Sequence, residues 1–238
     1  MLNLDNGYVS NFLIHWTGKE KGFDNLISIL SENRLRFGAN VFARLGLRTV
    51  TADVKDHMIC FTDVPIRFSR DHCESYGEFG IAFEKKFLAR LGAQPVLYCT
   101  PSTERDLKEV MRFTIEPGDA TVPPEVMKAL RRLLYFSQPY CKDYKDENSY
   151  CSPKASYYER EWRLGLQKFD ENYGEDGVAS RRYAAGNPLP SGKVIKADKY
   201  WYFPFSEADI SFVVLPQKKV ADLRCALPSR KLRIVELE

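Results

Sequence analysis

The sequence has few of the features that indicate a membrane, a metal or an oxidising compartment. No apolar run approaches the roughly 18 consecutive residues that read as a membrane-spanning helix, and the stretch from Met1 to Ser10 carries Asp5 and lacks the apolar core of a signal peptide. The six cysteines include no C-x-x-C pair, the spacing that structural zinc sites commonly use. We therefore expect a cytoplasmic protein with reduced thiols, no metal and no membrane contact.

Histidine and charge of one sign are scarce as well. The chain has three histidines and a net charge of +3, which is too small to indicate nucleic-acid or membrane binding by itself. It contains no Walker loop and no G-x-G-x-x-G, H-E-x-x-H or G-x-S-x-G motif. These absences disfavour nucleotide hydrolysis and α/β-hydrolase chemistry.

The residues that are present predict an ordinary globular core. Apolar residues make up 44% and charged residues 28% of the 238 positions, and one core serves a chain of this length. Strand-like and helix-like segments alternate without regular βαβ spacing, which favours an α+β fold over a doubly wound sheet. We expect a single domain over residues 1–238, with mixed or antiparallel sheets and flanking helices.

Apolar patterning places the expected elements. Strands are expected at 12–16, 58–61, 79–83, 95–99, 162–166, 210–215 and 232–237. Asp24 is the expected N-cap of a helix after the first strand, and further helices are expected after residue 83 and near residues 220–227. A helical insertion is expected near 102–138, and the Gly-rich, polar segment near 169–200 is expected to be a flexible excursion.

Polar residues at the end of the first expected strand form the first candidate site. His15 and Thr17 precede the loop that enters the first helix, where backbone N–H groups meet anionic ligands. A histidine here can donate hydrogen bonds into a cleft. The alternative is a histidine whose hydrogen bond to a backbone carbonyl serves the core.

A second candidate site lies on the strand near residue 162. Strand alternation puts Glu159, Glu161 and Arg163 on one side and Trp162 on the other. Glu161 is the better candidate for a general base, because it lies nearer the rigid strand. The alternative is a solvated Arg–Glu pair at a strand edge.

The segment Asp71–Gly77 forms a third polar cluster. Tyr76 offers an aromatic wall for a planar ligand, or ordinary packing. His72 and Cys73 are neighbours in sequence, and on a strand they point to opposite faces, which disfavours a thiol nucleophile.

Several blocks in order resemble the AbiGi family of bacterial abortive-infection phage-resistance proteins. The resemblance runs from about residue 11 to 166 and continues more weakly to the end, and its blocks are Ile14–Gly18, Met58–Pro65, His72 with Tyr76–Phe83, Gly92–Tyr98 and Glu159–Arg163. It implies phage defence and the antitoxin role in a two-gene system with a cognate toxin. A non-catalytic interaction module is therefore one expectation.

The order of the motifs is also similar, more distantly, to ADP-ribosyltransferases of the DarT type. That resemblance implies NAD as substrate, with His15 and Thr17 at the adenosine ribose, Tyr76 near nicotinamide and Arg163 among the cofactor-binding residues. Glu161 would be the catalytic residue, acting on a nucleic-acid or protein acceptor. The central arginine of the DarT type has no clear equivalent, and Arg67 or Arg70 is the candidate to substitute for it.

A nuclease is the remaining alternative, with Asp63, Asp71, Glu159 and Glu161 as metal ligands. No D-x-n-E-x-K pattern supports it.

Overall fold

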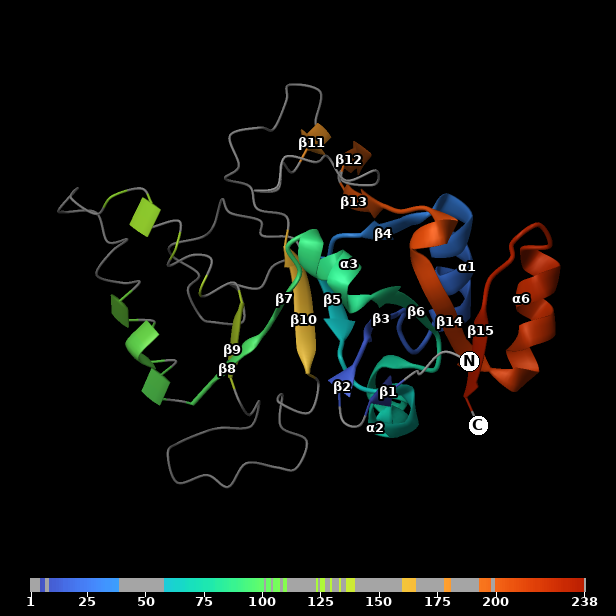
Figure 1. Cartoon of the computed structure of the whole chain (residues 1–238), viewed down its shortest axis with the longest axis horizontal. Helices are drawn as coiled ribbons and strands as arrows, with labels where there is room; N and C mark the ends of the chain where they lie inside the picture. Colours follow the sequence, from blue (N-terminus) through green and yellow to red (C-terminus); the bar gives the residue numbers. More distant parts are fainter. Residues whose placement is uncertain are drawn as a thin grey trace.

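The computed structural model describes residues 5–6, 9–38, 58–100, 160–165, 178–180, 193–197 and 200–237, with scattered residues between 102 and 139. These residues form an α+β fold, which confirms the predicted class (Figure 1). Helical positions such as 105–107 and 125–126 fall inside the expected helical insertion. Within the described residues, no helix is long and apolar enough to span a bilayer.

A seven-stranded sheet organises the molecule. Its strands are β3 (Phe12–Trp16), β5 (Met58–Thr62), β6 (Gly80–Glu84), β7 (Gln94–Pro95), β10 (Glu161–Gly165), β14 (Ile210–Pro216) and β15 (Ile234–Leu237). They lie in the order β15-β14-β6-β3-β5-β10-β7, and only β14 and β15 pair in parallel. The first of these strands in sequence, β3, therefore lies at the centre of the sheet.

One face of this sheet, called here the helix-covered face, carries the main core. Its strand side chains include Leu13, Phe61, Ile81, Phe83 and Val213. Leucines from three helices pack on them, namely Leu26 and Leu30 of α1 (Gly22–Glu32), Leu88 of α3 (Lys85–Arg90) and Leu223 of α6 (Val220–Ala226). Burial of this apolar surface supplies the largest favourable contribution to folding.

The opposite face, called here the groove face, carries a smaller cluster of buried side chains: Phe12, Ile14, Ala82, Phe212 and Val214. Two short helices lie beside it, η2 (Ile66–Phe68) and α2 (Arg70–Tyr76), and Ile66 packs against the cluster. Among the described residues, more helices pack on the helix-covered face than on the groove face.

A second, four-stranded sheet has the order β11-β12-β13-β4, with β4 at Arg34–Arg36, β11 at Val178–Ser180, β12 at Lys193–Ala197 and β13 at Tyr200–Pro204. Leu35 and Phe203 from this sheet join the main core. Strands β11 and β12 lie in the segment 169–200, which is expected to be a flexible excursion, and β12 pairs there with both β11 and β13. Smaller pairs join β1 (Asp5–Asn6) to β2 (Val9–Ser10) and β8 (Leu97–Cys99) to β9 (Ser137–Pro139).

Most predicted strands are confirmed to within two residues at each end, but the strand at 95–99 is divided. Residues 94–95 pair with β10, whereas residues 97–99 pair with β9 in another sheet. Pro95 has no N–H to donate to a further partner, and it lies where proline is tolerated, on an edge strand.

Two other local predictions are wrong. Asp24 is not the N-cap of α1: Lys21 occupies that position without a side-chain cap, and Asp24 lies in the first turn, where its charge still suits the helix dipole. The His72–Cys73 pair lies on a helix and not on a strand, because Cys73 N–H donates to Ser69 O and Gly77 N–H donates to Cys73 O.

Candidate functional site

His15 lies on β3 and makes a hydrogen bond to the backbone of β5. Its Nδ1 is 2.9 Å from Cys60 O, and its ring lies edge-on to Phe61 with centroids 5.9 Å apart. Because a carbonyl only accepts, Nδ1 carries the proton, and Nε2 of the neutral ring is an acceptor. Burial lowers the pKa of His15 below its usual value, which favours the neutral ring.

Thr17 closes the turn between β3 and α1. Its buried hydroxyl lies 2.6 Å from Gly22 O and 3.2 Å from Phe79 O, and Asn25 Nδ2 donates to Thr17 O at 2.8 Å. The Thr17 hydroxyl therefore fixes the loop that leads into α1.

Glu161 and Arg163 form a two-pronged ion pair on β10. Arg163 Nε and Nη2 donate to the two Glu161 carboxylate oxygens at 2.9 and 3.1 Å, and Nη1 donates to Ser137 O at 3.1 Å. The Arg163 side chain is 2% exposed and that of Glu161 is 12% exposed. The predicted alternation is confirmed for Glu161, Trp162 and Arg163. The arginine is buried against β9, and its charge is neutralised by the carboxylate.

The strand register determines how these candidates lie relative to one another. Ile14 pairs with Thr62, and Thr62 pairs with Glu161, so these three side chains lie on the groove face. His15 follows Ile14 and lies on the helix-covered face, in agreement with its contact to Phe61. His15 and Glu161 thus point to opposite faces of the sheet, on strands separated by roughly two spacings of about 4.8 Å. The structure does not bring them into one cleft.

Tyr76 and Cys73 lie on α2. The Tyr76 side chain is 37% exposed, and its ring lies 5.9 Å from that of His72. Burial and the nearby Glu78 charge raise the pKa of Cys73 to about 11. At neutral pH the Cys73 thiol is therefore almost wholly protonated, which disfavours it as a nucleophile.

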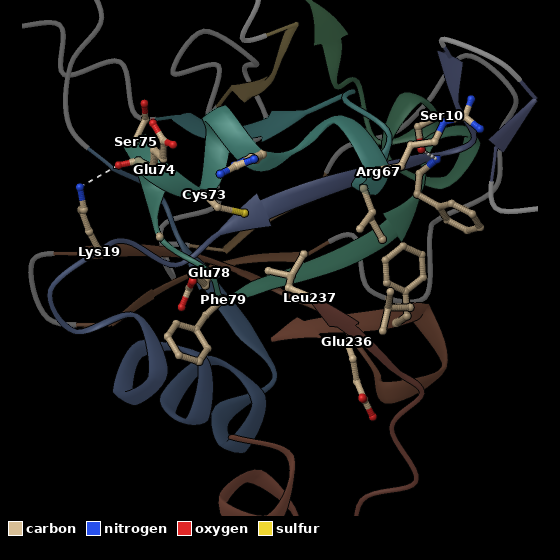
Figure 2. Close-up of a pocket in the computed structure, with 16 residues that line it drawn as sticks. Ser10, Lys19, Arg67, Cys73, Glu74, Ser75, Glu78, Phe79, Glu236 and Leu237 are labelled. Carbon is tan, nitrogen blue, oxygen red and sulfur yellow. Dashed lines mark hydrogen bonds between the residues drawn. The ribbon is translucent and has the colours of Figure 1, made fainter. Parts of the chain in front are cut away.

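A large cavity lies on the groove face, between the sheet and η2–α2 (Figure 2). Its volume is about 1410 Å³, and Phe12, Phe212, Val235 and Leu237 provide its apolar floor. None of the five predicted site residues lines it. Sequence reasoning missed this cavity because its floor combines β3 with the two strands at the other end of the chain.

Charged side chains stand around this floor. Lys19, Arg67 and Arg70 line the cavity, as do Glu74 and Glu78. Lys19 Nζ donates to Glu74 O at 2.7 Å, which ties the β3–α1 loop to α2 (Figure 2). The combination of an apolar floor and a charged rim is typical of a surface that binds a protein segment.

Glu236 also borders the cavity, but its carboxylate does not point into it. Its neighbours on β15, Val235 and Leu237, pack on the groove face, so strand alternation directs Glu236 away from the cavity (Figure 2).

The acidic residues proposed as metal ligands are dispersed. Asp63 is held by Lys85, whose Nζ lies 2.7 and 2.8 Å from the carboxylate oxygens, with Arg160 at 3.6 Å. Asp71 lies on α2, and Glu159 falls outside the described residues. Among the residues that the structure describes, no three His, Cys, Asp or Glu side chains gather as a metal site requires.

The comparisons with known proteins identify the family of the chain. No curated protein and no solved structure matches it. A family model described as "Putative abortive phage resistance protein AbiGi, antitoxin" matches residues 29–216. The match covers most of the chain and includes the second to fifth of the sequence blocks that resemble this family. The chain belongs to the AbiGi family of abortive phage resistance proteins.

Proposed function

We propose that this protein is the antitoxin of an abortive-infection pair and that it neutralises its toxin by binding it. The contact is the η2–α2 surface, defined here as Arg67, Phe68, Arg70 and Tyr76, together with the cavity beside it. The observation that carries the proposal is the exposure of two aromatic side chains there, Phe68 at 48% and Tyr76 at 37%.

The residue types on this surface support a protein contact. Aromatic residues and arginine are enriched among the side chains that contribute most to protein–protein binding. The Arg67 guanidinium lies over the Phe68 ring at 4.8 Å, so its stem and the ring form one continuous surface. An apolar side chain of the toxin fits the floor formed by Phe212 and Leu237, and η2–α2 contacts the flanking residues.

Co-expression with the toxin encoded by the neighbouring gene tests this proposal. Phe68→Ser and Arg70→Glu are each expected to abolish growth rescue. Each should also lower the amount of toxin that co-purifies by about tenfold or more, which is the effect expected when a residue that dominates an interface is substituted. Lys86→Glu is the matched control, because Lys86 is a 76% exposed side chain on α3, on the other face of the sheet. Rescue that survives both surface variants would remove the η2–α2 surface from the proposal.

An NAD-using transferase is the second candidate function. The observation that favours it is the position of β3 and β10 on either side of β5, which keeps the first-strand motif and the late glutamate near each other. In this reading His15, Thr17, Tyr76 and Arg163 bind NAD, and Glu161 supports transfer of ADP-ribose to a nucleic-acid or protein acceptor. The opposite orientations of His15 and Glu161 place it second.

Labelled NAD, incubated with the toxin and with cellular nucleic acid, separates the two functions. A transferase predicts incorporation of label by the wild type and its loss in Glu161→Gln. The binding proposal predicts equal background for both proteins and toxin neutralisation that survives Glu161→Gln. Circular dichroism of the variant checks that loss of the buried ion-pair partner has not unfolded it.

A further inference from the structure

The outward face of the four-stranded sheet carries a repeated pairing of arginine with tyrosine. Arg34 Cζ lies 4.1 Å from the centre of the Tyr202 ring, and Arg36 Cζ lies 4.8 Å from the centre of the Tyr200 ring. Arg36 is exposed, and the other three side chains are partly buried. These four residues are called here the Arg–Tyr ladder.

The strand register explains why the pairs repeat. Tyr202 is directly opposite Arg36, and Pro204 is opposite Arg34, so each arginine reaches one step diagonally along β13 to its tyrosine. Residues two apart on a strand lie on one face, roughly 6.6 Å from each other. The two cation–aromatic pairs therefore stand side by side on one surface.

The packing of the sheet does not account for these residue types. On the other face of this sheet, Leu35 and Phe203 are buried in the main core, and Trp201 packs against that core. That face satisfies the hydrophobic requirement of β4 and β13. The residues of the Arg–Tyr ladder are thus not needed to join this sheet to the core.

Within the part of the chain that the structure describes, the charge on the ladder is only partly compensated. Arg34 forms an ion pair with Glu32, whose pKa is lowered by hydrogen bonds from Ser28 and Arg34. Arg36 makes no ion pair with any residue in the described part of the chain. A guanidinium stacked on a ring is held flat and keeps its N–H groups free to donate, so the exposed Arg36 is suited to bind a phosphate oxygen.

We propose that the Arg–Tyr ladder binds single-stranded nucleic acid, with Arg36 on a phosphate and unpaired bases stacked against the arginine–tyrosine pairs. Proteins bind single-stranded nucleic acid with cations and aromatic rings that alternate on a sheet. Each base can stack on an aromatic ring, and each phosphate carries a negative charge. The ladder is separate from the η2–α2 surface, so this proposal does not depend on toxin binding.

Fluorescence anisotropy of the full chain with labelled single-stranded DNA and RNA of mixed sequence tests the proposal. We expect the wild type to bind at low salt. Arg36→Ala should weaken binding about tenfold and make the salt slope shallower by about 0.7, the contribution of one phosphate contact on a single strand. Tyr202→Leu should weaken binding about fivefold or more through lost stacking.

Arg224→Ala is the matched control, since Arg224 is an exposed arginine on α6 and its loss changes the net charge equally. Far-ultraviolet circular dichroism verifies folding of each variant. The proposal is overturned if neither oligonucleotide binds, or if Arg36→Ala and Tyr202→Leu bind as tightly as Arg224→Ala. It is also overturned if the ladder variants lose toxin neutralisation while the wild type binds no oligonucleotide, because the ladder then serves a protein partner.

Discussion

The two faces of the seven-stranded sheet differ in how the described residues pack on them. On the helix-covered face, α1, α3 and α6 close over a large core that includes side chains from both sheets. The groove face has a cluster of five buried side chains, and a cavity of about 1410 Å³ lies beside it. One face is built for stability, and the other leaves apolar surface beside a cavity.

This difference supports the proposed toxin contact, because the polar residues predicted as site residues serve the fold. His15 and Thr17 make hydrogen bonds within the fold, and Glu161 is neutralised by Arg163. Buried polar groups are normally satisfied in this way. Folding does not explain the exposure of Phe68 and Tyr76 beside the charged rim of the cavity.

The largest expected effect comes from truncating one phenylalanine to alanine on each face of the sheet. Phe83 is fully buried against the rings of Phe61, Phe87 and Phe205, so Phe83→Ala should lower the free energy of unfolding by about 3–5 kcal/mol. Phe212→Ala should cost about 1 kcal/mol less, because the space that it opens joins an existing cavity and leaves a smaller enclosed void.

Urea unfolding followed by far-ultraviolet circular dichroism measures both free energies. Equal losses for Phe83→Ala and Phe212→Ala would mean that the groove face is packed as tightly as the helix-covered face. The two faces would then not differ in packing.

An intermediate effect is expected where the groove face is joined to the first loop. Gly77 ends α2 with φ 91° and ψ 173°, a conformation that is essentially restricted to glycine. A Cβ at this position would clash with the Gly18 carbonyl group, whose carbon would be 2.8 Å away. Gly77→Ala should therefore cost about 1–3 kcal/mol of unfolding free energy and weaken toxin binding by displacing α2.

Gly38→Ala is the control for this substitution, because its added Cβ would meet only Met58 O at an ordinary 3.5 Å and no positive φ is required. Thermal melting compares the two. A Gly77→Ala protein with the melting temperature of Gly38→Ala would show that α2 adjusts without strain.

The sequence predicted the fold class because its strongest signals are local. Strands such as β3 and β14 are short apolar runs ended by Gly18 or Pro216, and their positions follow from composition alone. Strand β12 was missed, since its partners at Tyr200–Pro204 and Val178–Ser180 supply the stability that its own sequence pattern does not show.

The two proposed binding surfaces were harder to predict, because each combines segments far apart in the chain. The alternation of side chains on β10 was predicted correctly. Alternation within one strand does not tell which side chains of β3 share a face with those of β10. The strand register decides this, and it puts His15 and Glu161 on opposite faces. The Arg-Leu-Arg of β4 and the Tyr-Trp-Tyr of β13 both have a period of two residues. Only their pairing brings these two patterns into one ladder.

The smallest expected effect is a pH dependence that originates on the helix-covered face. Burial lowers the pKa of His15 in the folded protein, so the unfolded chain binds a proton more readily. The contribution of His15 to the free energy of unfolding is therefore fully present above the unfolded pKa of about 6.5. As the pH drops below that value, this contribution falls by at most about 1.4 kcal/mol per pH unit.

His15→Asn isolates this contribution, since an asparagine amide donates to Cys60 O as Nδ1 does but does not titrate. The other two histidines and all carboxylates are present in both proteins, so their contributions cancel in the difference between the two urea-unfolding profiles. From pH 7.5 to 5 we expect the wild type to lose stability more steeply than the variant. Parallel profiles would mean that His15 is protonated as easily in the fold as in the unfolded chain, and it would then be a histidine open to solvent or ligand.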